Sequence, residues 1–114
     1  MSKTKDLAQL ADLAQLMLDH RLGTLKTSSD RLEQSRMQLL ALNQSAEPFD
    51  LDPVTTIRVG LEYERWADQR RAELNLVIAR QSAAWLEARG EAQMAFGRLQ
   101  ALRALAEKSK SGRR

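Results

Sequence analysis

Cysteine is absent from this chain of 114 residues, and histidine occurs once, as His20. Without cysteine, the chain can form neither a disulfide nor a zinc–thiolate site, and it has no thiol nucleophile. The bundle-core metal motif requires Glu three residues before His, but that position is Met17. Neither a phosphate-binding glycine loop nor a nucleophile elbow is present. We therefore expect no metal site, no cofactor and no enzymatic activity.

Strand-forming and aromatic residues are scarce. Val and Ile together supply five residues, and only five residues are aromatic, too few for a sheet or a thick globular core. No apolar run reaches the about 18 residues that a membrane span needs. The opening residues 1–6 are not followed by the continuous apolar segment of a secretory signal. These absences predict a cytoplasmic protein.

Leucine and alanine dominate what is present. They supply 35 of the 49 hydrophobic residues, and Ala, Glu, Lys, Leu and Arg together make up 61 of 114. This composition is typical of long helices and coiled coils. The sequence therefore predicts an all-α protein.

Strong helix breakers gather in one segment, residues 46–53. Pro48 disfavours helix at the residue before it, so it ends the first helix. Asp52 can cap the next helix, and Pro53 suits its first position. A short connection favours antiparallel neighbours. The predicted segments are helix 5–45, turn 46–52 and helix 53–109, forming one antiparallel hairpin domain over 1–109, and a basic disordered tail over 110–114.

Seven-residue apolar repeats run through both predicted helices and indicate a coiled-coil seam. In the first helix the repeat consists of Ala11, Leu18, Leu25, Leu32 and Leu39, with Leu22 between them. In the second helix it consists of Ala67, Leu74, Gln81, Ala88, Ala95 and Leu102, with companions Ile57, Ile78, Trp85, Ala92, Leu99 and Ala106. Polar seam positions are predicted at Ser29, Arg36, Glu64 and Arg71. Residues 23–30 are poor in helix formers, which leaves a kink or a three-helix bundle open. The leucine repeat continues through these residues in phase, and this favours one continuous helix.

The register of the hairpin predicts an overhang. Folding back about residue 49 places Ala11 near Ala88 and exhausts the first helix near residue 98. The leucines that follow would then lack an intramolecular partner. An uncovered apolar stripe beside basic residues is typical of a binding surface. A frayed tail and packing between two copies stay open as alternatives. The predicted partner-binding residues are Arg98, Leu99, Leu102, Arg103 and Leu105.

Basic charge gathers in the second half. Residues 1–53 carry a net charge of −2 and residues 54–114 carry +5, and thirteen of the eighteen cations are Arg. Arg favours bidentate pairing with carboxylates and phosphates, so an acidic protein surface or a nucleic acid would suit this half. The basic region that a DNA-binding zipper needs before its leucines is absent, which argues against DNA binding of that kind.

Tyr63 and Trp66 are three residues apart and share one helix face. Two interpretations stay open. The two rings form an aromatic contact patch near the turn, or they cover the seam at that end of the hairpin.

The second half, over residues 54–108, resembles the FliJ/YscO family of type III export stalk proteins. The resemblance is carried by segments 64–78 and 85–95 and by the Ala-, Leu- and Arg-rich segment 96–108. It implies an antiparallel two-helix coiled coil that acts as a non-catalytic stalk or adaptor in flagellar or type III protein export. Its partners would be the hexameric ring of the export ATPase, the export gate and substrate chaperones, with the chain termini meeting the ATPase.

On that resemblance, the five predicted partner-binding residues face the ring. The chain departs from the family in being shorter than usual and in carrying two prolines in its turn, so an export-gate site cannot be placed. Two other classes are kept as alternatives. One is a homodimerising coiled-coil scaffold without an export role. The other is an Arg-rich nucleic-acid-associated helical protein, whose binding would weaken steeply as salt rises.

Overall fold

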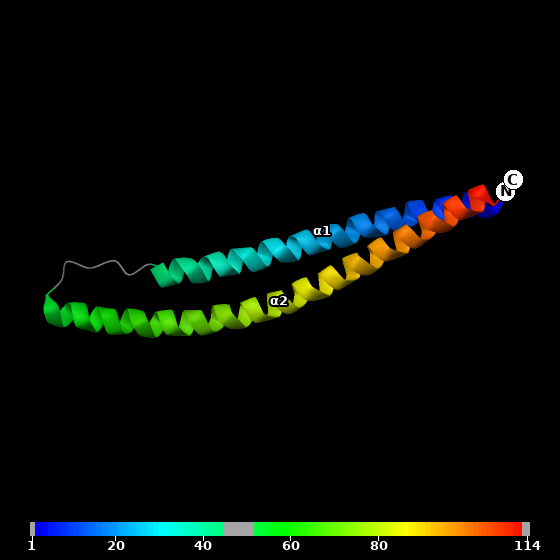
Figure 1. Cartoon of the computed structure of the whole chain (residues 1–114). Coiled ribbons are helices and arrows are strands. Elements are labelled where there is room, and N and C mark those ends of the chain that lie inside the picture. Colours follow the sequence, from blue (N-terminus) through cyan, green and yellow to red (C-terminus); the bar gives the residue numbers. More distant parts are fainter. Residues whose placement is uncertain (1, 45–51, 113–114) are drawn as a thin grey trace. The chain divides into compact units, whose positions relative to one another are not determined.

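Two long helices make up the part of the chain that the computed structural model describes, residues 2–44 and 52–112 (Figure 1). Helix α1 spans Ser2–Gln44 and helix α2 spans Pro53–Ser111. The all-α antiparallel hairpin predicted from composition and breakers is confirmed. Helix α1 begins three residues earlier than expected, and α2 extends two residues into the segment predicted as a tail. The predicted turn falls mostly on residues 45–51, which lie outside the described residues, as do 113 and 114.

Helix α2 begins at the predicted capping residue. The Thr55 backbone N–H donates to Asp52 Oδ1 at 2.7 Å, and the Thr55 hydroxyl donates to Asp52 Oδ2 at 2.9 Å. The Thr56 N–H donates to the Asp52 carbonyl at 2.8 Å, which is the first bond of the helix. Pro53 takes the first helical position, where its missing N–H would have had no helical partner.

Helix α1 runs without a break through residues 23–30, as the repeat in phase favoured. The hydroxyls of two threonines there donate hydrogen bonds to carbonyls of the helix backbone. Thr24 donates to the His20 carbonyl at 3.2 Å, and Thr27 donates to the Gly23 carbonyl at 3.1 Å. These bonds satisfy side chains that would otherwise compete with the helical backbone for partners.

The chain divides into two compact units. Unit 1 consists of Met1–Ser29 and Ala84–Arg114, and unit 2 consists of Asp30–Ala83. The core of unit 1 is a buried cluster of Leu18, Ala95 and Leu99, with Ala11 and Ala14 packed against it. The core of unit 2 is a buried cluster of Leu42, Ala67 and Leu74, with Leu39 and Tyr63 packed against it.

The predicted seam is largely the buried face. Its buried members are Leu18, Leu32, Ala67, Leu74, Ala88, Ala92, Ala95 and Leu99. Five seam predictions are wrong. Ile57 is 64% exposed and Leu22 is 47% exposed, and the polar positions Ser29, Arg36 and Glu64 are exposed as well. The polar seam position in the second half of α1 is Ser35, which is buried, whereas Arg36 is exposed.

Candidate partner-binding surface

The five predicted partner-binding residues all lie on α2 within unit 1, but they do not share one surface. Leu99 is only 1% exposed and belongs to the core of the unit. Leu102 is half-buried, whereas Arg98, Arg103 and Leu105 are exposed. The predicted stripe therefore divides into core and surface, and Leu99 is covered by the chain itself.

The overhang that led to this prediction is wrong. Thr4 and Ser109 share a hydrogen bond of 2.9 Å between their hydroxyls, so α1 reaches nearly to the end of α2 in unit 1. Folding back about residue 49 would place Thr4 near residue 95, which is fourteen residues, or two heptads, before Ser109. A shift by whole heptads leaves the seam residues unchanged, so the repeat alone cannot distinguish the two registers.

The exposed residues divide between the two flanks of the seam. Arg98 and Leu105 are seven residues apart and therefore share one flank, whereas Arg103 lies on the other flank. Arg103 donates a hydrogen bond to Gln15 Oε1 at 2.8 Å, which ties it to α1. Arg98 forms no ion pair or hydrogen bond with any residue in the described ranges 2–44 and 52–112.

A groove of about 380 Å³ follows the flank of unit 1 that carries Arg98. Helix α1 contributes Leu13, Ala14 and Met17 to it, and α2 contributes Met94, Ala95 and Leu102. Leu13, Met17 and Met94 are 59%, 49% and 59% exposed, so a two-helix unit leaves much of this lining in contact with solvent.

Charged residues also line this groove. Arg21 Nη1 and Glu91 Oε2 form an ion pair of 3.0 Å across the two helices, and both residues line the groove together with Arg98. The pair is about one-third to two-fifths exposed, so solvent screens it and its net contribution to stability is small. The pair instead places one positive charge, on Arg21, and one negative charge, on Glu91, at one end of the apolar groove.

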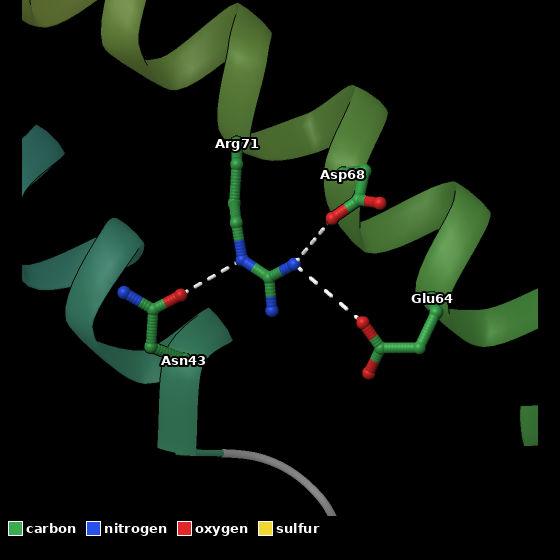
Figure 2. A network of polar contacts seen from close by, with 4 residues as sticks. All are labelled: Asn43, Glu64, Asp68 and Arg71. Carbon is green, nitrogen blue, oxygen red and sulfur yellow. Dashed lines mark hydrogen bonds and ion pairs between the residues drawn. The ribbon is translucent and has the colours of Figure 1, made fainter.

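Unit 2 contains a polar cluster around Arg71, which Figure 2 shows from close by. Arg71 Nε donates to Asn43 Oδ1 at 2.8 Å, and Nη1 lies 2.7 Å from Asp68 and 3.7 Å from Glu64. Arg71 was predicted as a break in the seam, and the prediction missed that its guanidinium links α2 to the end of α1. The cluster fixes which residues of the two helices lie opposite each other in unit 2.

Uncovered apolar residues in unit 2 lie near the start of α2. Val54, Ile57 and Leu61 are 71%, 64% and 62% exposed, and they line a second groove with Arg58, Glu62 and Arg65. Sequence reasoning placed the overhang at the opposite end of α2. The signal that could have located it is the spacing of these three residues, which share a face at i, i+3 and i+7.

The two aromatic residues of unit 2 differ in burial, and each matches one of the two interpretations left open. The Tyr63 and Trp66 rings lie 5.7 Å apart at 44°. Tyr63 packs on the core of unit 2, whereas Trp66 is 55% exposed. In unit 1 the Arg89 guanidinium lies 5.6 Å from the centre of the half-buried Trp85 ring, within the range of a cation–π contact.

Within residues 2–44 and 52–112, no group of three or more His, Asp or Glu side chains is arranged to hold a metal ion. Neither α1 nor α2, as described, has an apolar stretch of the length a membrane crossing requires.

The comparisons with known proteins return no relative. No protein-family model matches the chain, and neither does any curated protein or solved structure.

Proposed function

We propose that this protein is a cytoplasmic, non-catalytic coiled-coil stalk or adaptor that binds the ATPase ring of a flagellar-type protein export system. The pattern of residues 54–108 resembles the export stalk family, and the two-helix hairpin is the fold which that resemblance implies. The export gate and substrate chaperones are further partners in this proposal.

One observation in unit 1 carries the proposal furthest. The hydrogen bond between Thr4 and Ser109 places the start of α1 beside the end of α2. In the family that the sequence resembles, the termini meet the ATPase. Arg98 and Leu105 lie exposed on α2 eleven and four residues before Ser109, and Arg98 is available for an acidic partner.

The proposed contact therefore uses Arg98 and Leu105, and Leu102 where it reaches the groove. Leu99 supports the site from the core and does not contact the partner. An exposed Arg mainly speeds association with an acidic surface, whereas a leucine that becomes buried mainly slows dissociation. Both effects can be measured separately.

A binding assay with the purified export ATPase tests the proposal. We expect Arg98→Glu with Leu105→Ala to weaken binding by about tenfold or more, which corresponds to about 1.4 kcal/mol. The matched control, Arg65→Glu with Leu61→Ala, changes the same residue types at exposed positions of unit 2 and should leave binding within about twofold. Circular dichroism confirms that both variants stay helical.

Two outcomes would refute the proposal. The first is the absence of binding by the unmodified chain to a purified flagellar-type export ATPase. The second is an equal loss in both double variants, because binding would then not depend on this end of the molecule. Steep weakening with salt together with binding to plain RNA or DNA would favour the nucleic-acid alternative instead.

A further inference from the structure

Unit 1 exposes large apolar residues on one flank of both helices. They are Leu10, Leu13, Met17, Met94 and Leu105, each between 47% and 59% exposed. The groove lies between the two rows. We call the surface that these five residues form the flank face. Of the nine large apolar residues that are exposed in the described part of unit 1, five lie on this surface, which is typical of a site where another helical surface packs.

Charged residues bound the flank face at both ends. At one end, Arg21 lies on α1 and Glu91 on α2, and both line the groove. At the other end, Asp6 lies seven residues before Leu13, and Lys108 lies fourteen residues after Met94. Whole-heptad spacing places Asp6 and Lys108 on the same flank as those apolar residues. Lys3, seven residues before Leu10, shares this flank but lies beyond Asp6. Between Asp6 and Arg21 on α1, and between Glu91 and Lys108 on α2, the sign of the charge is therefore reversed.

This reversal makes the flank face complementary to itself. When a second copy packs face to face with its helices antiparallel, α1 lies against the partner's α1, and α2 lies against the partner's α2. The Arg21 end of one copy then meets the Asp6 end of the other, and the Glu91 end meets the Lys108 end. Opposite charges meet at both ends.

A single two-fold axis satisfies both helix pairs. An axis midway between positions 13 and 14 of α1 brings Leu10 opposite Met17 of the second copy and Asp6 opposite Arg21. An axis midway between positions 99 and 100 of α2 brings Met94 opposite Leu105 and Glu91 opposite Lys108. Positions 13–14 of α1 lie beside positions 99–100 of α2 in the register that the Thr4–Ser109 hydrogen bond defines. Apolar contacts and charge pairs therefore agree on one symmetric arrangement.

We infer that the flank face of unit 1 binds a second copy of this chain in an antiparallel, two-fold symmetric arrangement. The occupant is a second copy because the apolar and charged residues match their own symmetry mates. This inference does not rest on the proposed export function, since it follows from residues 6–21 and 91–108 alone.

The size of the flank face predicts a reversible dimer. Residues 6–21 of α1 span about 25 Å, and two helices side by side are about 20 Å wide. The footprint is therefore about 500 Å² per copy, or about 1,000 Å² in total, at the lower limit for a specific interface. We expect dissociation in the micromolar range.

Arg98 lies within the flank face and opposes tight association. In the symmetric arrangement it faces the small Ala101 of the second copy, and its long stem carries the charge to the edge of the contact. Two copies of Arg98 lie near each other about the axis, and like charges repel. Arg98→Ala should therefore strengthen the dimer, by about threefold or more.

Sedimentation velocity on the full chain over a concentration series is the first test. We expect the unmodified chain to dimerise, and Leu13→Glu to stay monomeric, because it places two carboxylates beside the axis. The matched control is Leu16→Glu on the same helix. Leu16 is 65% exposed and points away from the flank face, so this variant should dimerise normally. Monomeric unmodified chain, or equal behaviour of both variants, would overturn the inference.

Cysteine cross-linking is the second test and does not depend on how Leu13→Glu folds. The chain has no native cysteine, so each introduced thiol is unique. We expect Leu13→Cys to form a disulfide-linked dimer on oxidation and Leu16→Cys not to. A mixture of Met94→Cys and Leu105→Cys chains should cross-link, whereas Met94→Cys alone should not. Cross-linking of Met94→Cys alone would show a parallel arrangement and refute the inference. None of these assays contains the ATPase, so their failure is distinct from failure of the proposed function.

Discussion

Leu18 of α1 and Leu99 of α2 are in the same buried cluster, although 81 positions separate them in the sequence. Leu99 is 1% exposed and Leu18 is 7% exposed. This relationship fixes the register of unit 1, and it removes Leu99 from the set of residues that a partner could contact. The surface of unit 1 that is available for binding is therefore the flank, and the seam is occupied by the chain itself.

The first prediction separates the core from the surface on α2. Leu99→Ala should lower the free energy of unfolding by about 3 kcal/mol, because it removes a buried side chain and leaves a cavity. Leu105→Ala should change it by less than about 0.5 kcal/mol, since Leu105 is 52% exposed. Urea unfolding followed by circular dichroism measures both, at a protein concentration where the chain is monomeric. Equal effects of the two substitutions would contradict the register.

The second prediction concerns the cluster around Arg71 in unit 2. A double-mutant cycle with Asn43→Ala and Arg71→Ala should give a coupling energy of about 0.5–1 kcal/mol, because Arg71 Nε donates to Asn43 across the two helices. Asp68→Ala should couple to Arg71→Ala more weakly, since both residues lie on α2 and their ion pair is exposed. A coupling energy of zero between Asn43 and Arg71 would show that the cluster does not hold the register.

The third prediction concerns the start of α2. The Asp52 carboxylate accepts hydrogen bonds from the backbone N–H of Thr55, which has the larger effect, and from the Thr55 hydroxyl. Both bonds lower the pKa of Asp52 below its ordinary value. Since the folded-state pKa is lower than the unfolded one, the cap stabilises the helix at pH above the unfolded pKa. The stabilisation is lost as pH falls through the folded pKa.

Thr55→Val tests that cap because it removes the hydroxyl and keeps the backbone donor. We expect the pKa of Asp52 to rise part of the way to its ordinary value, since the backbone bond is the larger cause and remains. An NMR titration of the Asp52 carboxyl carbon measures the pKa in both chains. An unchanged pKa would mean that the hydroxyl does not contribute.

The seam could be predicted from the sequence because the heptad repeat reports directly which residues of a helix face its partner. Leu18, Leu74 and Ala95 were placed correctly for this reason. The capping role of Asp52 was also predicted, since a carboxylate before Pro53 is a local signal that requires no knowledge of the partner helix.

The register could not be predicted, because a slip of two heptads preserves every seam position. The contacts that differ between the registers lie between the helices, in pairs such as Arg21 with Glu91, and these pairs have no signature along either helix alone. The flank face was missed for the same reason. Leu13 and Met94 lie far apart in the sequence, and only the correct register brings them to one groove.

Gln81 is the subject of the last prediction, because it lies at a seam position with a buried side-chain oxygen. Its Oε1 has no hydrogen-bond partner among the residues that the structure describes. A buried polar atom without a partner lowers stability. We therefore expect Gln81 to weaken the coiled coil.

Replacing Gln81 with leucine tests this expectation. Gln81→Leu keeps a similar volume and removes the unpartnered oxygen, so we expect the free energy of unfolding to rise by about 1–2 kcal/mol. The matched control, Gln69→Leu, lies on the exposed side of the same helix and should change it by less than about 0.5 kcal/mol. Urea unfolding measures both. If Gln81→Leu instead destabilises the chain, then the Gln81 amide has a partner in solution and its role is structural.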